Sequence, residues 1–335
     1  MPVVSVVMPV HNHEATCAAA LASIRQQSLR DVEIIAVDDG STDGSRGALE
    51  HAAERDPRVR IVSIPHGGIV AALQAGVASS GAPLIARMDA DDWSHPERIA
   101  KQVAFLDGNP DVGAVDCRVE LGWSHVTGGG MVDYVGRLNS LLGWPDLRNS
   151  LFEESPLVHP AALMRRTALD AAGGYRDDPW PEDYSLWLRM VAAGYRLAKI
   201  DEVLFRWNDP PGRLTRTGPR YEGACIAALK ARFLAVLRPQ VAAQGCQLWG
   251  MGPTGKMTLS ALQREGVRVV RAFDVDPRKI GNRVGGVRIH PLDELPSCRG
   301  QLTLVALGTR PAKALAQKHL AALKFAPWED YLLLS

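Results

Sequence analysis

The stretch "LIARMDADDWSHPER", residues 84–98, joins an apolar run to a cluster of acids and then to the start of a helix. The apolar run ends at Met88 and predicts a buried β-strand. Asp89, Asp91 and Asp92 follow it directly. Carboxylates this close repel one another, and a buried charge without a partner is strongly disfavoured. We therefore expect these acids either to hold a cation or to form a solvated acidic turn.

The residues after the acids predict the N-terminus of a helix. Ser94 and Glu97 have the spacing of a capping box, and Pro96 stands where the first turn of a helix accepts proline. The acids would then occupy the short link between the strand end and the helix cap.

The residues before this stretch alternate between strand and helix patterns. The predicted strands are 3–10, a run from residue 32, 58–64 and 83–88, and the predicted helices are 14–28, one ending near residue 54, and 68–79. Such alternation is typical of an α/β fold, whose parallel sheet carries helices on both faces and binds ligands at the carboxyl ends of its strands. Asp38 and Asp39 also end a strand, so two strands bring acids to one edge of the sheet.

The composition is that of an ordinary globular protein. The chain has 335 residues, enough for two domains, and its net charge of +1 gives no broad basic surface for nucleic acid. Its five cysteines form no C-x-x-C pair, which argues against a zinc site and favours a reducing cytoplasm. The first apolar run ends at Val10, and no run is long enough to span a membrane. We expect a cytoplasmic protein without an integral membrane segment, whose membrane contact would be peripheral.

The middle of the chain is more mixed. Strands are predicted at 112–119, 161–165 and 196–205, and a helix is predicted from Pro181. Glu182 and Asp183 fall in the first turn of that helix, where acids are stabilising in any case. The alternative is a general base, because an ionised carboxylate can take a proton from a hydroxyl nucleophile.

A loop rich in Pro, Gly and Arg follows Trp207 and precedes a basic amphipathic helix at about 220–237. The arginines of this loop are Arg213, Arg216 and Arg220. Their fork-shaped guanidinium groups suit phosphates, and a solvated basic loop is an equal alternative. Residues 238–245 are predicted as a linker, so we divide the chain into domains 1–238 and 239–335.

The C-terminal segment returns to strand and helix alternation. Strands are predicted at 246–250, 267–276 and 302–308, with helices from Gly255 and from about Pro311. Gly250, Gly252 and Gly255 form a G-x-G-x-x-G turn, and Asp274 ends the next strand, which is the context of a dinucleotide-binding fold. A P-loop is excluded, because Met257 stands where Ser or Thr must bind Mg²⁺.

Five stretches together resemble the inverting family 2 glycosyltransferases of the GT-A fold, in that family's order and spacing. They are "VSVVMPVHN", "VEIIAVDDGSTDGS", "GGIVAALQAG", "ARMDADDWSHPER" and "WPEDYSLWLRMVAAG", and the resemblance covers roughly residues 1–210. It implies a nucleoside-diphosphate sugar as donor, with a UDP-sugar favoured. It also implies a single displacement at the anomeric carbon, assisted by Mn²⁺ or Mg²⁺.

The resemblance also implies roles for individual residues. Those assigned to the donor are Pro9, His11, Asn12, Asp38, Asp39, Asp89, Arg213 and Arg216. Asp91 would hold the metal with Asp89 and Asp92 beside it, and Asp183 would be the base with Glu182 beside it. The chain departs from the family pattern at His11, where members often carry Tyr. It departs again at Leu73-Gln74, where members often carry Arg-Asn, so one expected cationic contact near the donor is absent.

The C-terminal domain resembles the small Rossmann-like modules that are fused to some sugar-modifying enzymes. Its predicted nucleotide-binding residues are Gly250, Gly252, Gly255 and Asp274. Nucleotide binding, regulation, acceptor binding and packing all remain open for this domain.

Two other functions compete with a glycosyltransferase. A sugar nucleotidyltransferase should carry a Gly-rich, basic loop after the first strand, and "PVHNHEAT" has neither Gly nor Lys or Arg. A non-catalytic nucleotide-sensing protein would not need Asp89, Asp91 and Asp183. The acceptor stays open between a glycan, a lipid-linked saccharide, a small molecule and a modified tRNA nucleoside, and a homo-oligomer is compatible with the sequence.

Overall fold

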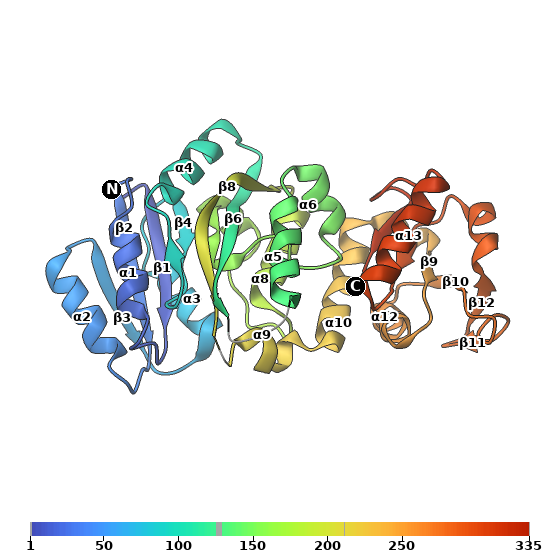
Figure 1. Ribbon diagram of the computed structural model, residues 1–335, viewed down its shortest axis with the longest axis horizontal. Coiled ribbons are helices and arrows are strands. Elements are labelled where there is room, and N and C mark those ends of the chain that lie inside the picture. Colours follow the sequence, from blue (N-terminus) through green and yellow to red (C-terminus); the bar gives the residue numbers. More distant parts are fainter. Residues whose placement is uncertain (1, 125–128, 211, 335) are drawn as a thin grey trace. The chain divides into compact units, whose positions relative to one another are not determined.

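The computed structural model describes residues 2–124, 129–210 and 212–334. The chain forms two compact units, each with its own sheet (Figure 1). The N-terminal unit contains Met1–Leu147, Pro156–Asp178 and Glu182–Arg213, and the C-terminal unit contains Arg148–Ser155, Pro179–Pro181 and Leu214–Ser335. The division into domains 1–238 and 239–335 stays a prediction.

The N-terminal unit is built on an eight-stranded sheet in the order β3-β2-β1-β4-β7-β6-β8-β5. Its first half consists of β1 (Val4–Val10), β2 (Val32–Asp39), β3 (Val59–Ile64) and β4 (Leu84–Arg87). These strands are parallel, and β1 lies between β2 and β4. All seven residues of β1 are buried, as expected for an inner parallel strand with helices on both faces. The predicted α/β fold is confirmed.

The second half of this sheet is mixed in direction. It consists of β5 (Trp93–Ser94), β6 (Val112–Ser124), β7 (Leu163–Arg165) and β8 (Arg196–Asp209). Strand β7 runs antiparallel to both β4 and β6, whereas β8 runs parallel to β6. The short strand β5 pairs antiparallel with β8 and so joins the acidic loop after β4 to that strand.

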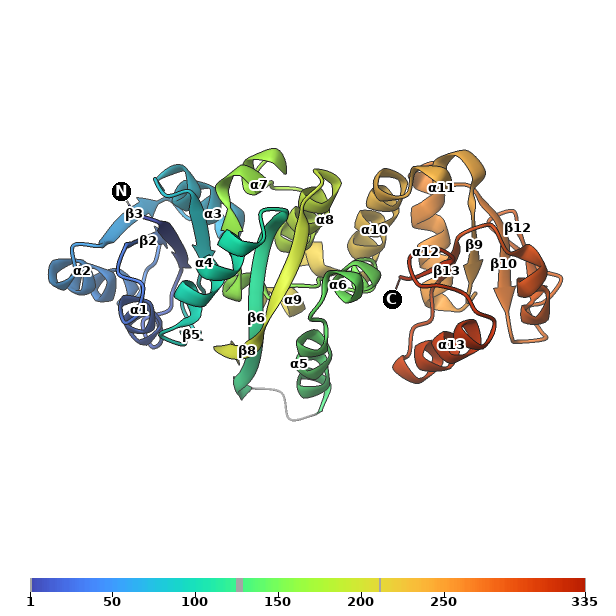
Figure 2. The same cartoon turned by 90° about the horizontal axis from the view of Figure 1, so that it is seen from above.

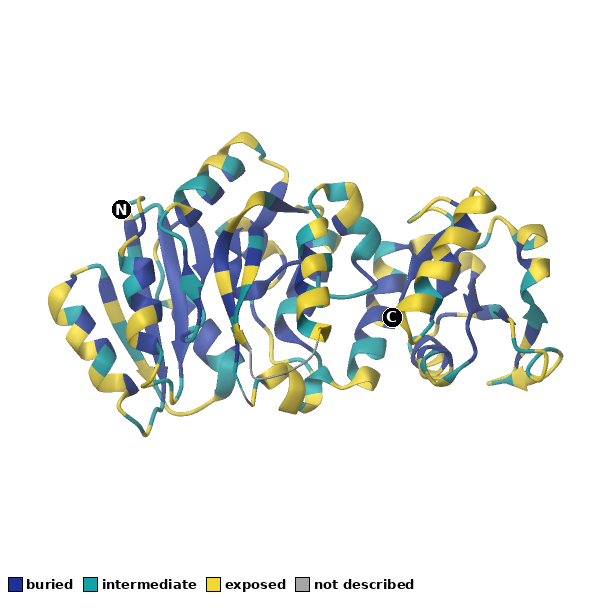
Figure 3. Ribbon diagram, in the orientation of Figure 1, coloured by how far each residue is buried: buried dark blue, intermediate teal, exposed yellow. Residues whose placement is uncertain are grey.

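Helices cover both faces of the sheet, and its strands are largely buried (Figures 2 and 3). The helices from the chain's first 192 residues are α1 (Cys17–Arg25), α2 (Ser45–Arg55), α3 (Gly68–Ala78), α4 (Arg98–Gly108), α5 (Gly130–Ser140), α6 (Trp144–Ser150), η1 (His159–Ala161), α7 (Arg166–Ala171) and α8 (Glu182–Ala192). Leu21 of α1 packs in the cluster that contains Val6 and Ile34, whereas Ala72 of α3 packs with Ile35. Since neighbouring residues of a strand face opposite sides, α1 and α3 lie on opposite faces of the sheet.

Helix α3 packs very closely on the sheet. A Cβ atom added at Gly76 would lie 2.4 Å from Cγ1 of Val7 and 3.1 Å from Cγ2 of Val37. Only glycine therefore lets α3 approach β1 and β2 at this distance.

The capping box predicted at Ser94 and Glu97 is wrong. Helix α4 begins at Arg98, and its N-terminus has no side-chain cap. Ser94 lies on β5 opposite Phe205, and its hydroxyl accepts hydrogen bonds from Arg98 Nε (2.7 Å) and Gln27 Nε2 (3.2 Å). These tertiary partners take the hydroxyl that a local cap would have used.

The C-terminal unit carries a six-stranded sheet in the order β11-β12-β10-β9-β13-β14. Its elements are α9 (Leu214–Thr217), η2 (Pro219–Tyr221), α10 (Gly223–Leu237), α11 (Pro239–Gln244), β9 (Cys246–Trp249), α12 (Pro253–Arg264), β10 (Val269–Asp274), β11 (Arg283–Val284), β12 (Val287–Pro291), η3 (Leu292–Cys298), β13 (Thr303–Val305), α13 (Arg310–Ala322) and β14 (Tyr331–Leu333). All neighbouring strands are parallel except the pair β11 and β12. This arrangement confirms the predicted Rossmann-like domain.

Two segments of this unit differ from the prediction. The predicted linker 238–245 contains helix α11, and the predicted loop after Trp207 contains the short helices α9 and η2. Pro219 and Pro239 stand in the first turns of η2 and α11, where proline starts a helix instead of breaking it. In the described part of the chain, no helix has both the length and the apolar character needed to cross a bilayer.

Candidate functional site

Three carboxylates converge in the loop after β4. Asp89, Asp91 and Asp92 each offer an oxygen, and these oxygens lie within 4.8 Å of one another. Asp92 is only 4% exposed. Its Oδ1 accepts a hydrogen bond from the backbone N–H of Asn208 (2.8 Å), whereas its Oδ2 is buried and has no hydrogen-bond partner among the described residues. The loop therefore presents a buried carboxylate oxygen that lacks the partner it needs.

The electrostatics of the loop also favour a cation. Burial, and then the charge of Asp89, raises the pKa of Asp91 to about 6. Burial and the charges of Asp91 and Asp89 raise the pKa of Asp92 well above its usual value. Carboxylate oxygens are the ligands that Mg²⁺ and Mn²⁺ prefer. The donor set and the unpartnered oxygen of Asp92 thus fit a hard divalent ion.

The proposed base lies at the start of α8. Asp183 Oδ1 accepts the backbone N–H of Tyr184 (2.7 Å), and part of its side chain reaches solvent. Burial, and then the charge of Glu182, raises the pKa of Asp183 to about 7. The helix is anchored by its apolar face, on which Trp187 is fully buried. An acid with a pKa near neutrality can exchange a proton under physiological conditions.

Arg213 lies where its charge acts on both groups of acids. Burial and neighbouring carboxylates raise the pKa of Asp91, Asp92 and Asp183, and the positive charge of Arg213 partly offsets this rise. Its guanidinium stacks on the ring of Trp207 at 4.1 Å and lies 3.5 Å from a carboxylate oxygen of Asp209. The charge of Arg213 thus acts on the predicted metal acids and on the predicted base. Trp207 was not predicted as a site residue, although an aromatic side chain beside an arginine-rich loop is a readable signal.

Arg216 is placed differently. It is exposed on α9 and belongs to the C-terminal unit. Its role in donor binding stays a prediction.

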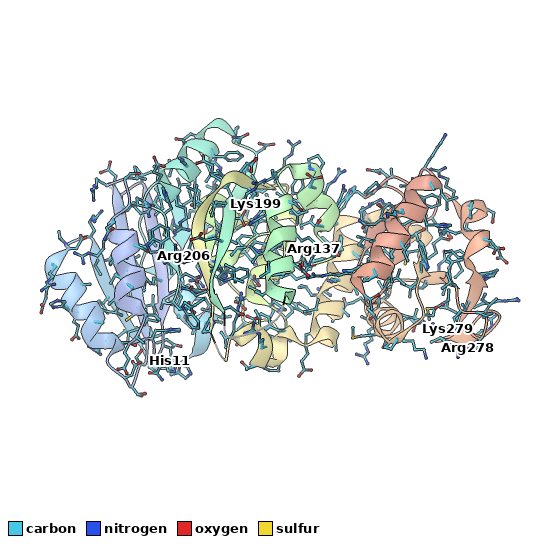
Figure 4. The ribbon with its side chains drawn as sticks, viewed as in Figure 1. His11, Arg137, Lys199, Arg206, Arg278 and Lys279 are labelled. Atoms are coloured by element: carbon cyan, nitrogen blue, oxygen red, sulfur yellow. The ribbon has the colours of Figure 1, made fainter. Side chains whose placement is uncertain are left out.

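The predicted donor residues at the ends of β1 and β2 form a hydrogen-bonded corner. His11 follows β1 (Figure 4), and its ring stacks on His66 with the centroids 3.9 Å apart. The carboxylate of Asp39 accepts the backbone N–H groups of Gly67 (2.7 Å) and Gly68 (2.9 Å). Asp39 therefore anchors the turn before α3. His66, which belongs to this turn, was missed in the sequence because nothing in its local pattern marks it.

Two further residues fix the loops beside this corner. Asn12 has a φ of 56° and accepts the backbone N–H of Thr42 through its side-chain oxygen (2.8 Å). Asp38 Oδ1 accepts the backbone N–H of Ser41 (3.0 Å). Pro9 lies within β1 and pairs with Val37. Each of these residues is thus placed at the carboxyl edge of the sheet, where the donor is predicted to bind.

His11, Asp39 and His66 are close enough to suggest a second metal site. Their geometry argues against it, because the two imidazole planes are only 21° apart and stacked. A metal bound at about 2.1 Å lies near the plane of each imidazole, and stacked rings cannot both direct a nitrogen at one such point. Both oxygens of Asp39 already accept hydrogen bonds.

The glycine-rich turn of the C-terminal unit joins β9 to α12. Gly250 has a φ of 105°, and a Cβ atom at Gly255 would lie 1.7 Å from the oxygen of Gly250, so the turn requires both glycines. A Cβ atom at Gly252 would meet no atom within 4 Å. Only the middle glycine therefore faces open space.

Asp274 is held by the protein itself. Its carboxylate accepts the backbone N–H groups of Met251 (2.8 Å) and Asp276 (2.9 Å), and Lys279 Nζ lies 2.9 Å away. Figure 4 shows Lys279 beside Arg278 in the segment after β10. Asp274 thus connects the glycine-rich turn to the end of β10, and a basic side chain lies next to it.

Comparison with known structures shows the fold. The mannosyltransferase PcManGT from Pyrobaculum calidifontis, in complex with GDP-Man and Mn²⁺, superimposes with a TM-score of 0.52 at 19% identity, over 97% of this chain and 81% of that one. Residues 1–349 of S. aureus TarS, in complex with UDP-GlcNAc, give a TM-score of 0.54 at 14% identity, over 79% and 80% of the two chains. The predicted GT-A fold is confirmed.

Sequence comparison shows the family. EpsE of Bacillus subtilis (strain 168), which is classed as a glycosyltransferase, is 32% identical over 213 residues, which cover 61% of this chain and 72% of that protein. Residues 243–326 match the family described as CoA binding domain, in agreement with the Rossmann-like fold of the C-terminal unit. Residues 5–173 match glycosyl transferase family 2, and the chain belongs to that family.

Proposed function

We propose that this glycosyltransferase transfers a sugar from a nucleoside-diphosphate sugar to an acceptor hydroxyl with inversion, that it requires a divalent metal, and that it prefers a UDP-sugar. The observation that carries the proposal is the buried, unpartnered Oδ2 of Asp92 inside a group of three carboxylates. PcManGT with GDP-Man and Mn²⁺, and TarS with UDP-GlcNAc, support a nucleotide-sugar donor on this fold.

Asp91 and Asp92 are the proposed metal ligands, with Asp89 beside them. Bound Mn²⁺ or Mg²⁺ would neutralise the charge that develops on the leaving diphosphate. Arg213 would add a second positive charge on the same side, since it already acts on both Asp91 and Asp92.

Asp183 is the proposed general base, with Glu182 tuning its proton affinity. As the acceptor oxygen forms its bond to the anomeric carbon, the hydroxyl proton passes to a carboxylate oxygen of Asp183. The bond between the anomeric carbon and the donor's phosphate oxygen breaks, and its electron pair leaves with the nucleoside diphosphate. Attack opposite to the leaving group inverts the configuration.

The donor's nucleoside is assigned to the corner made by the ends of β1 and β2. The proposed donor-binding residues are Pro9, His11, Asn12, Asp38 and Asp39, together with Asp89 at the ribose and Arg213 and Arg216 at the phosphates. The stacked rings of His11 and His66 offer an aromatic surface on which a base could stack.

The remaining assignments concern the rest of the protein. We propose a domain boundary at residues 238/239 and a nucleotide-binding role for Gly250, Gly252, Gly255 and Asp274 in the C-terminal domain. The proposed acceptor is a glycan, a lipid-linked saccharide, a small molecule or a modified tRNA nucleoside. The proposed location is the cytoplasm, with peripheral membrane contact and a homo-oligomeric state as compatible options.

A thermal-shift panel tests the donor and the metal together. It uses UDP, GDP, CDP and their sugars, with and without Mn²⁺, on the wild type, on Asp91→Ala and on Asp170→Ala as an exposed acidic control. A ligand at 100 times its Kd stabilises the folded state by about 2.7 kcal/mol. We expect one diphosphate to raise the Tm only with Mn²⁺, in the wild type and in Asp170→Ala. An equal shift in Asp91→Ala would contradict the metal assignment.

A further inference from the structure

Arg87 is a buried arginine at the end of β4, two residues before the acidic loop. Its side chain is 2% exposed. Nη1 donates to the carbonyl of Met88 (2.7 Å), and Nη2 donates to Oδ1 of Asp89 (2.6 Å). Its own carbonyl accepts a hydrogen bond from Nη2 of Arg98 (3.2 Å). Both the backbone and the guanidinium of Arg87 are therefore fixed.

The charge of Arg87 is opposed by acids from two elements. Besides Asp89, it interacts electrostatically with the carboxylate of Glu182. Glu182 is buried at the start of α8, next to the proposed base. A buried ion is tolerated only when it is paired, so one guanidinium compensates acids on the metal side and on the base side of the site.

The hydrogen bonds of the acidic loop occupy some of its carboxylate oxygens and leave others available to an ion. Asp89 Oδ1 is committed to Arg87, and Asp92 Oδ1 is committed to the backbone N–H of Asn208. A carboxylate oxygen that already accepts a short, charge-assisted hydrogen bond is a weaker metal ligand. The oxygens left for an ion are the unpartnered Oδ2 of Asp92, the carboxylate of Asp91 and the second oxygen of Asp89, because Arg87 takes only Oδ1 of Asp89.

We propose that Arg87 is a positioning residue that withholds one carboxylate oxygen of Asp89 from the metal and fixes the orientation of the acidic loop after β4. This inference rests on the proposed metal-dependent function. Arg87 does not touch the reacting atoms. It acts through Asp89, and its fork is required because one side chain must reach both the carbonyl of Met88 and Oδ1 of Asp89, which lysine cannot do with the same geometry.

The test measures the affinity for Mn²⁺ without donor, by electron paramagnetic resonance, and then kcat and the KM for the donor. In Arg87→Met a positive charge is lost and Asp89 is released, so we expect Mn²⁺ to bind at least about tenfold more tightly. We expect kcat to fall at least about a hundredfold, because the ion and the ribose-facing acid are misplaced. Tighter metal binding with slower turnover is a combination that mere loss of structure does not produce.

Three comparisons separate a positioning role of Arg87 from the effect of its charge and from a general loss of stability. Arg87→Lys keeps the charge, so we expect Mn²⁺ affinity within about threefold of the wild type and kcat reduced at least about tenfold. Asp89→Asn should weaken Mn²⁺ binding more in the Arg87→Met background than in the wild type, as a double-mutant cycle would show. Arg165→Met is the structural control, because every hydrogen bond that Arg165 donates to the described residues goes to a backbone carbonyl. It should lower the Tm and leave Mn²⁺ affinity unchanged.

The Mn²⁺ affinity and the kcat of the two Arg87 variants can each contradict a positioning role for Arg87. Weaker or unchanged Mn²⁺ binding in Arg87→Met would overturn it and would leave a structural role alone. Wild-type kcat in Arg87→Lys would overturn it as well, and this variant keeps the test open if Arg87→Met fails to fold. If the wild type itself binds no Mn²⁺, the proposed metal site fails first and the inference falls with it.

Discussion

The pH dependence of transfer is the sharpest test of the proposed base. Burial and the neighbouring charge of Glu182 raise the pKa of Asp183 to about 7. A base acts only when it is deprotonated, so activity should rise with pH until the pKa is passed. With a pKa of about 7, roughly 1% of Asp183 is ionised at pH 5 and half at pH 7. We expect kcat/KM for the acceptor to increase about fiftyfold between these pH values.

An ordinary aspartate would behave very differently. With a pKa of about 3.9 it is more than about 90% ionised at pH 5, so the same rate would change by less than about 10%. The assay measures initial rates at saturating Mn²⁺ and donor, so that the profile reports the donor-loaded enzyme. A flat profile between pH 5 and pH 7 would refute the argument that Asp183 is a base with a raised pKa.

Two variants make the assignment specific. Asp183→Asn cannot accept the proton, and we expect it to bind donor normally while transfer falls at least about a thousandfold. Glu182→Gln removes the charge that raises the pKa of Asp183, so the midpoint of its profile should move to lower pH. A midpoint that does not move would show that Glu182 is not the charge that tunes the base.

Substitutions at three glycines and at one buried lysine test the packing of the helices, the glycine-rich turn and the charge state of the lysine. Gly76→Ala should lower the free energy of unfolding by about 1–3 kcal/mol in urea titrations, because the added Cβ atom would meet Val7. Gly47→Ala on α2 should raise it by about 0.5–1 kcal/mol, because a Cβ atom there meets no atom within 4 Å. Gly252→Val should leave the fold intact and block any dinucleotide in the C-terminal unit, and calorimetric binding of such a ligand at wild-type affinity would contradict the glycine-rich assignment. Burial lowers the pKa of Lys230 to about 7, so above pH 7 the unfolded protein binds more protons at this residue than the folded protein does. The stability of the wild type should therefore increase with pH, and its Tm should rise relative to the Tm of Lys230→Met between pH 7 and pH 10.

The parts of the fold that local pattern controls could be predicted from the sequence. Strands β1 and β2 are β-branched runs that are buried on both faces, and such runs read as parallel strands without further information. The acids at the ends of β2 and β4 were also predictable, because a parallel sheet gathers the carboxyl ends of its strands at one edge. Asp89, Asp91 and Asp92 do converge there.

The parts that depend on distant partners could not be predicted. Asp92 is held by the backbone of Asn208, 116 residues away, and no side-chain pattern reveals a backbone donor. The hydroxyl of Ser94 has the right spacing for a cap, yet Arg98 and Gln27 reach it first in the folded chain. Arg87 was readable in principle, since a charged residue at the end of a buried strand needs a partner.

The division of the chain into units has a practical consequence for anyone who wishes to isolate the enzyme's catalytic part. The chain leaves the N-terminal unit at Arg148–Ser155 and Pro179–Pro181 and returns each time, so one cut cannot separate the two units cleanly. The last residue of the N-terminal unit is Arg213, whose charge acts on Asp91 and Asp183. A fragment that ends there would replace the following peptide with a free carboxylate and bring a new negative charge next to the acids. Any shortened enzyme should therefore retain residues beyond this arginine.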